Sequence, residues 1–411
     1  MANEKLLSIN YLKHFQCLGS ECEDNCCSGW DVHVDHDTLE RMHECPDAEL
    51  RAYFEEHLQL EAPHTSCPAR AARFTLTADR RCGFLGEDKL CQLQQRAGPE
   101  YLPCLCSRYP REENIVDGVR ERNATLGCPE TARLALLGQG ALTFEEEGVE
   151  DRWPQMMHRE QDSAGASGAK AYRAHFSMVR ALVLQIMQNS KRPIETRIFR
   201  LGELCHTLHD LIEQSRFGDI PARLQAIARR RVSWFAQRKK AVADEVVAHT
   251  LQCLCGFELM ELPLPLRYHK SLAQVRRAFS DIVTLTPVEI VSTLERAEHK
   301  YARTFLRRYP RFYENYLVNL ILKQLFPFDE QRPVWEQFQE LAVHYVLGRI
   351  QLIASAMSDG DFQPQGAIGA ISSLTRTWGA NSEFRKILGQ AGLVKAEFYA
   401  GQGVPCAFIS T

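Results

Sequence analysis

Cysteine is the residue type in this chain whose number and spacing could support chemistry. Eleven of the fifteen cysteines fall within the first 128 residues. Cys17, Cys22, Cys26 and Cys27 place four sulfurs within eleven residues. Further along this part of the chain follow Cys82, Cys91, Cys104, Cys106 and Cys128. Such a density fits a metal or iron–sulfur site, a disulfide framework, or buried cysteines that act as small apolar residues.

The expected cellular compartment decides between these alternatives. The first ten residues contain no apolar core of signal-peptide length and no small-residue cleavage site. We therefore expect a cytoplasmic protein, in which thiols stay reduced and disulfides are rare. Clustered cysteines in that environment favour metal ligands or redox groups, with unliganded cysteines as the alternative.

The spacing of the thiols does not select the metal. An all-cysteine zinc site and a [4Fe–4S] cluster each need four thiolates, so the sequence can supply either, or one of each. The side chains of adjacent cysteines point the same way only in a tight turn. Cys26 and Cys27 therefore either lie in such a turn or belong to different sites. The CxxxCxxC signature of radical S-adenosylmethionine enzymes fails, because Gly29 occupies its third cysteine position after Cys22 and Cys26.

Length and composition suggest a soluble protein with two or three units, and the periodicity described below makes it mainly α-helical. The chain has 411 residues, 45% hydrophobic content and a net charge of −3, and it has no apolar run that approaches the roughly 20 residues of a bilayer span. We expect an irregular cysteine-rich module at 1–135, packed on a multi-helix domain at 171–411. The connector at 136–170 contains the acidic Glu145–Glu147 and the small residues of Ser163–Ala169.

Periodic apolar residues and end signals predict the helices. Thr286, Pro287 and Glu289 form a helix start, and apolar residues at helical spacing continue to Phe305 before Pro310. Similar periodicity predicts helices at 172–187, 198–212, 316–325 and 334–353. Strand-like alternation is scarce. From about residue 360 we expect Gly-rich turns, a short helix at 382–388 and a tail that ends as an edge strand or docked extension.

Three other polar groups have simpler interpretations. His33 is a possible nitrogen ligand, although a surface or hydrogen-bonded role is commoner. Cys205, His206 and His209 have the spacing of some metal sites, but core packing is favoured without a third ligand. The basic stretch at 223–240, which contains Trp234 and Phe235, predicts a solvated helix face, with contact to an anionic membrane surface, acidic protein or nucleic acid as alternatives.

Several motifs together resemble those of the flagellin lysine N-methylases, and more remotely zinc- or iron-chelating domains with a CxxCxxCC-like signature. They occur in the same order along most of the chain. They are Phe15-Gln-Cys17, Cys22, Cys26-Cys27-Ser-Gly-Trp30, Cys82-x-Phe-Leu-x5-Cys91, Leu102-Pro-x-x-Cys106-x-Arg-Tyr-Pro-Arg111, Cys128-Pro-Glu130, Phe312-Tyr-Glu-Asn-Tyr-Leu-Val-Asn319 and Leu325-Phe-Pro-Phe328.

The resemblance implies methyl transfer from S-adenosylmethionine to lysine side chains of flagellin in the bacterial cytoplasm, by a protein-lysine N-methyltransferase. It also implies a cysteine-bound [4Fe–4S] cluster, or alternatively zinc, that binds the donor directly or holds the N-terminal module in shape. The family's cysteine positions fall on Cys17, Cys22, Cys26, Cys27, Cys82, Cys91, Cys106 and Cys128, and Cys104 is additional.

Lysine is a nucleophile only when its amine is neutral, and its ordinary pKa of about 10.4 leaves little neutral amine near pH 7. A methylase must therefore desolvate the amine or accept its proton. Tyr313, Glu314 and Tyr316 are candidate proton acceptors and Asn319 a candidate orienting group; helix packing is the alternative for all four. Two other functions remain open for the chain: a non-enzymatic metal-binding protein, and a structural zinc module in a flagellin-interaction protein.

Overall fold

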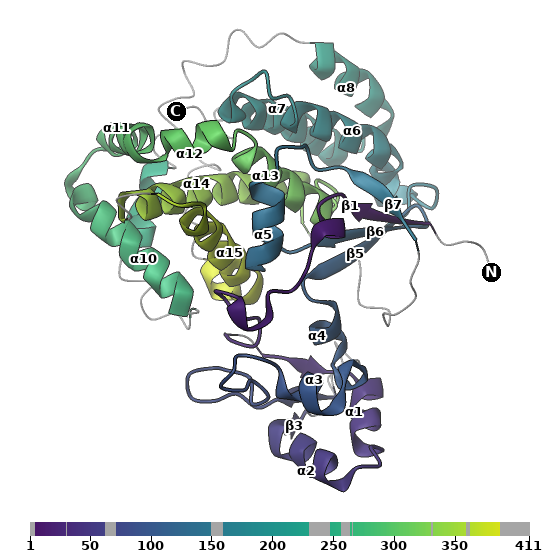
Figure 1. Cartoon of the computed structure of the whole chain (residues 1–411). Helices are drawn as coiled ribbons and strands as arrows, with labels where there is room; N and C mark the ends of the chain where they lie inside the picture. Colours follow the sequence, from purple (N-terminus) through teal and green to yellow (C-terminus); the bar gives the residue numbers. More distant parts are fainter. Residues whose placement is uncertain are drawn as a thin grey trace.

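The computed structural model describes residues 5–29, 31–61, 71–148, 159–229, 247–255, 264, 266–329, 332–358 and 362–386. The molecule has two parts (Figure 1). A small part is formed by described residues between 33 and 108, and a larger helical body packs around a second sheet. The mainly helical fold expected from the sequence is confirmed.

The sheet of the body has the strand order β7-β1-β6-β5-β8. Its strands are β1 (Leu6–Ile9), β5 (Arg111–Val116), β6 (Val119–Ala124), β7 (Phe144–Glu147) and β8 (Arg159–Gln161). A tight turn through Asp117 and Gly118, both at positive φ, joins β5 to β6. Strands are thus more frequent than the sequence suggested, and two of them lie in the expected connector at 136–170. Pairing with β1 and β5 orders these two segments.

The helices of the body include those predicted from the sequence, together with α5, α10 and α15, which were not predicted. They are α5 (Pro129–Leu136), α6 (Phe176–Met187), α7 (Ile194–Glu213), α8 (Ile220–Arg229), α10 (Leu266–Ala278), α11 (Pro287–Ala297), α12 (Arg303–Arg308), α13 (Phe312–Lys323), α14 (Val334–Ser358) and α15 (Pro364–Ala380). The predicted start of α11 is confirmed as a capping box between Thr286 and Glu289. A π-helical segment, Glu298–Ala302, joins α11 to α12.

Helix α14 forms the centre of the body and packs on α7, α10 and α15. By length and hydropathy it resembles a membrane span, but 89% of its most apolar window is buried inside the protein. Burial on all sides explains why its sequence is apolar around the whole circumference. Its composition therefore fits the core helix of a folded body.

The expectation of Gly-rich turns after residue 360 was wrong, because α15 occupies 364–380. Pro364 lies in the first turn of this helix, where its missing N–H costs no hydrogen bond. Its glycines allow close packing: a Cβ on Gly369 would lie 3.0 Å from the guanidinium of Arg267. Residues 382–386 are helical, as predicted, and the expected tail strand lies outside the described residues.

The cysteine-rich part has a small core of its own. It contains the sheet β2 (His33–Val34), β4 (Ala72–Phe74) and β3 (Leu58–Leu60), with α1 (His36–His43), α2 (Ala48–His57), α3 (Gln92–Ala97) and α4 (Cys104–Arg108). Val34, Phe54, Phe74 and Phe84 are fully or almost fully buried in this core. Buried residues between 116 and 136 pack instead in the core of the body, and the domain boundary at 135 stays a prediction.

Candidate functional site

Four of the predicted ligand cysteines gather on the core of the small part. Cys82 is buried in it, and Cys27, Cys91 and Cys106 are partly buried against it. Short backbone contacts produce this arrangement: the Cys82 N–H donates to the Cys27 carbonyl at 2.8 Å, and a single bridge pairs Leu85 with Cys91. The predicted turn between Cys82 and Cys91 is therefore present, and the two thiols influence each other electrostatically.

Cys26 and Cys27 lie in a tight turn, one of the two arrangements that the sequence allowed. A hydrogen bond from the Cys27 thiol lowers the pKa of Cys26 to about 7, with nearby Arg376 acting in the same direction. The pKa of Cys27 is raised by the same hydrogen bond and by burial. Burial raises the pKa of Cys106 well above its ordinary value, and the neighbouring Cys26, Cys82 and Cys91 raise it further.

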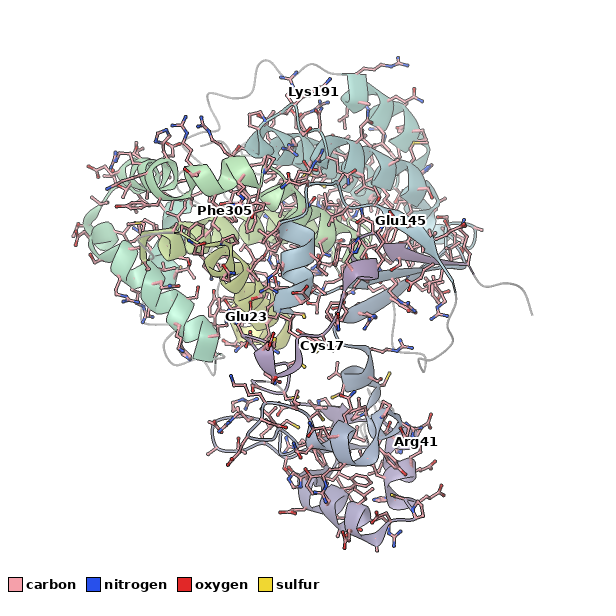
Figure 2. The ribbon with its side chains drawn as sticks, viewed as in Figure 1. Cys17, Glu23, Arg41, Glu145, Lys191 and Phe305 are labelled. Carbon is pink, nitrogen blue, oxygen red and sulfur yellow. The ribbon has the colours of Figure 1, made fainter. Side chains whose placement is uncertain are left out.

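The remaining cysteines of the predicted set lie nearer the body. Cys22 and Cys128 influence each other electrostatically, and burial raises the pKa of Cys128 to about 11. Cys17 is exposed at the junction of the two parts (Figure 2). Cys104, which the family pattern left as additional, has Arg108 and Asp35 as its charged neighbours.

The described thiols of the small part are electrostatic neighbours, but they do not form a complete metal site. Within the described residues, no three His, Cys, Asp or Glu side chains are arranged to hold a metal ion. All thirteen cysteines in these ranges are free thiols. Thiolates are nevertheless the ligands that zinc sites and iron–sulfur clusters use, and four of these cysteines pack in or against the same small core. The ligand set of eight cysteines stays a prediction.

The less specific histidine candidates have ordinary partners. His33 lies 3.1 Å from a carboxylate oxygen of Glu61. Cys205 is fully buried in the core of the body, and His206 lies 3.1 Å from Asp210 on the same helix.

The Cys22–Cys27 segment is anchored to the body by its acidic residues. Asp24 accepts from Arg376 of α15 at 2.9 Å, and the Asn25 carbonyl accepts from the same guanidinium at 3.2 Å. Glu23 pairs with Arg133 of α5 at 2.6 Å, near the junction marked by the Glu23 label in Figure 2. These contacts hold the sulfur-rich turn next to α5 and α15.

A cavity of about 910 Å³ lies beside this junction. Residues from α4, β5, α13, α14 and α15 line it, so both parts of the molecule contribute to its wall. The lining side chains used below are Arg108, Arg111, Glu113, Arg332, Glu340, His344 and Trp378. A volume of this size suits a drug-sized ligand.

Hydrogen bonds and an ion pair connect several polar side chains on one side of the cavity. Glu340 accepts from the indole N–H of Trp378 at 2.9 Å and also pairs with Arg332. The ring of His344 lies against Trp378, with centroids 4.4 Å apart, and its Nδ1 is 2.8 Å from the Tyr316 hydroxyl. Within the described residues its Nε2 has no hydrogen-bond partner, because the nearest carboxylate oxygen, on Glu340, is 3.9 Å away.

The four predicted catalytic residues all lie on α13, and none is among the residues that line the cavity. Glu314 is buried and accepts from Arg197 at 2.6 Å and from Arg311. The Asn319 amide donates to the Tyr11 hydroxyl at 2.8 Å. Burial raises the pKa of the Tyr313 and Tyr316 phenols, which keeps both protonated. Their contacts are those of a packed helix, and their catalytic roles stay predictions.

His344 should make the stability of the protein depend on pH. Burial lowers its pKa to about 3, so the unfolded chain takes up the proton first as the pH falls. The stability that the neutral imidazole provides is complete above its unfolded pKa of about 6.5 and is lost progressively below it. We expect a loss of about 2 kcal/mol between roughly pH 7.5 and pH 5 that is absent from His344→Gln.

Urea unfolding of the parent and the variant at both pH values checks this expectation. Other titrating groups are common to both proteins and cancel in the difference. Tyr316→Phe retains the imidazole and should retain the pH-dependent loss. Identical pH dependence in the parent and His344→Gln would contradict the prediction.

Sequence reasoning missed the cavity residues. Arg108 and Arg111 stand in a motif that had been singled out for its cysteine, and no role was assigned to their charges. Glu340, His344 and Trp378 lie in apolar helical sequence, where nothing local distinguishes a cavity wall from a core. Only the packing of α14 and α15 brings these three together.

Comparison with known proteins identifies the family. Residues 180–398, more than half of the chain, match the family model described as FliB lysine N-methylase C-terminal domain. A lysine-N-methylase of Salmonella choleraesuis is 29% identical over 140 residues, which cover 34% of each chain. The corresponding protein of Salmonella typhimurium is 28% identical over the same length and shares of both chains.

The flagellar biosynthetic protein FliU of Salmonella muenchen is 29% identical over 137 residues, covering 33% of this chain and 79% of FliU. The match thus spans only about a third of the length of the two lysine N-methylases. No solved structure matches. The resemblance drawn from the sequence motifs is confirmed, and the chain belongs to the FliB lysine N-methylase family.

Proposed function

We propose that this protein transfers methyl groups from S-adenosylmethionine to lysine side chains of flagellin. The observation that carries the proposal is the FliB domain, whose matched region supplies α13, α14 and α15 to the wall of the 910 Å³ cavity. Relatives named lysine-N-methylase and flagellar biosynthetic protein support the reaction and the flagellar substrate.

The chemistry requires a neutral amine next to the donor. The lysine Nζ lone pair attacks the donor methyl carbon, the carbon–sulfur bond breaks, and S-adenosylhomocysteine leaves. The lysine proton is released to solvent or to a base, because only the unprotonated amine has the lone pair. A cavity that removes the amine from water lowers the pKa of lysine and favours this form. His344 is neutral near pH 7, so it adds no positive charge that would repel the sulfonium.

The proposal includes a metal or [4Fe–4S] cluster held by the cysteine-rich part. The candidate ligands for it are five neighbouring thiols, those of Cys26, Cys27, Cys82, Cys91 and Cys106, and Cys22 lies near Cys128. When bound, such a group would hold four thiolates together and so stabilise the fold of the cysteine-rich part. The protein's own residues fix the Cys26–Cys27 turn through Asp24 and Arg376.

Location and other contacts follow from this assignment. Methylation before export places the protein in the bacterial cytoplasm with flagellin as its protein partner. The basic stretch at 223–240 is proposed as a peripheral membrane contact; within it Arg223 and Arg229 lie on α8, and 230–240 fall outside the described residues.

Methyl transfer is tested with the anaerobically purified, metal-replete protein, flagellin and labelled S-adenosylmethionine. We expect label on flagellin and a stepwise increase of its intact mass, one methyl group at a time. Flagellin with its lysine amines chemically blocked serves as the control substrate. Absence of transfer with metal-replete protein that still binds flagellin would refute the enzyme and support the flagellin-interaction alternative.

A further inference from the structure

We propose that Arg108 and Arg111 form an anion subsite of the large cavity that binds the carboxylate of its ligand. Under the proposed function, on which this assignment rests, the ligand is the methyl donor and the carboxylate is that of its amino-acid end. The two arginines lie on either side of Tyr109 and Pro110, at the end of α4 and the start of β5.

Within the part of the chain that the structure describes, Arg108 is a buried cation without an ion-pair partner. Its side chain lines the cavity, only 6% of the residue is exposed, and its Nε is buried without a hydrogen bond within the described residues. Leaving a cation in this state costs free energy unless an anion is supplied. A guanidinium is also the group best shaped to hold a carboxylate through two parallel hydrogen bonds.

The surroundings contain excess positive charge. Glu113, the carboxylate that acts electrostatically on Arg108, is already bonded by Arg120 at 2.8 Å and by Arg122 at 2.9 Å. Glu113 is therefore engaged by two other guanidinium groups, one of which, Arg122, also pairs with Glu147 at 3.2 Å. Burial lowers the pKa of Arg108, and the neighbouring positive charges of Arg120 and Arg122 lower it further.

Arg111 adds a second cation on the same wall. Its guanidinium lies 5.0 Å from the centroid of the Phe15 ring, and the carboxylate that acts on it electrostatically, Glu147, pairs with Arg122 at 3.2 Å. Burial lowers its pKa too, with Arg122 acting in the same direction. Other cations on the cavity wall have partners of two kinds. Lys323, Arg332 and Arg376 pair with the acids Glu112, Asp329 and Asp24 respectively. Arg159 and Arg385 donate to the backbone carbonyls of Lys323 and Gly379.

The composition of the rest of the wall favours a zwitterion over a polyanion. Trp378 lines the same cavity, and an aromatic ring attracts a cationic group, whereas the Glu340 carboxylate beside it is already engaged by Arg332 and by the Trp378 indole. A ligand with a carboxylate and a sulfonium or ammonium group can therefore bind the arginines through its anionic end and the aromatic ring through its cationic end. Inorganic phosphate carries negative charge and no cationic group, so it tests binding to the arginines alone.

The test is binding by isothermal titration calorimetry to the full-length, metal-replete protein. The ligands are S-adenosylhomocysteine, its decarboxylated analogue and inorganic phosphate. For Arg108→Gln we expect S-adenosylhomocysteine to bind about 10- to 100-fold more weakly, the range of a charge-assisted hydrogen bond. The decarboxylated analogue should bind the parent and the variant almost equally. Arg81→Gln, at an exposed arginine paired with Asp79, is the control and should bind as the parent does.

Thermal unfolding separates a binding role from a structural one. Removing an uncompensated buried cation should raise the unfolding temperature of Arg108→Met, whereas removing a structural ion pair would lower it. The subsite would be overturned if Arg108→Gln bound S-adenosylhomocysteine and its decarboxylated analogue more weakly than the parent does by the same factor. It would also be overturned if the variant bound both ligands as tightly as the parent does. The parent could bind neither adenosyl ligand yet bind phosphate more tightly than Arg108→Gln does. That result would support the anion subsite and refute S-adenosylmethionine as the ligand of the cavity.

Discussion

Replacing Cys106 by Ser is expected to remove most of the bound metal and to abolish methyl transfer, whereas Cys104→Ser retains both. The two residues lie on the same short helix, α4, but have different surroundings. Cys106 packs on the core with Cys27, Cys82 and Cys91, while the charged neighbours of Cys104 are Arg108 and Asp35. A serine hydroxyl stays protonated where a thiolate would bind a soft metal.

The measurement is the metal content of anaerobically purified protein together with its visible absorption spectrum. Iron with a brown absorption identifies a cluster, and zinc is colourless. Circular dichroism should show that the helical body is intact in both variants, because its core excludes the four thiols. Equal metal content in Cys106→Ser and Cys104→Ser would remove Cys106 from the site. Full activity after complete metal removal would limit the metal to a structural role.

The helices were predictable because their signals are local. Apolar spacing and the Thr286 capping box fix α11 without reference to any distant residue. The β5–β6 hairpin also has a local signal, since Asp117-Gly118 is a typical two-residue hairpin turn. Its strands escaped prediction because they carry charged residues where alternation would place apolar ones. The cross-strand pair of Glu113 with Arg120 and Arg122 explains how those charges are accommodated.

The cavity residues could not be predicted from the sequence, unlike the thiols. Cysteine is rare and its clustering is visible in the sequence, so each thiol stands out as a candidate ligand. Arginine, glutamate and tryptophan are ordinary residues of helices, and Arg108 and Trp378 are 270 positions apart. Their shared wall depends on how α4 meets α15, which the Asp24–Arg376 ion pair helps to fix. No property of either segment alone predicts that meeting.

Replacing Glu314 by Ala is expected to destabilise the folded protein by about 3–5 kcal/mol, because it leaves Arg197 buried without its carboxylate. Both side chains are almost completely buried, and their atoms are 2.6 Å apart. The pair joins α7 to α13, so its loss should loosen the packing of the body. Urea unfolding measures the change. Glu112→Ala, which removes the half-exposed partner of Lys323, should cost less than about 1 kcal/mol.

A second substitution distinguishes structure from catalysis at this position. Arg197→Met removes the unpaired cation, so the double variant Glu314→Ala with Arg197→Met should recover a large part of the lost stability. If Glu314 is only a structural partner, the double variant should also recover methyl transfer. A proton acceptor would behave differently: Glu314→Gln would keep the shape and much of the stability but lose the reaction. Stable Glu314→Gln protein without methyl transfer would therefore restore the catalytic role predicted from the sequence, even though the carboxylate lies outside the cavity wall.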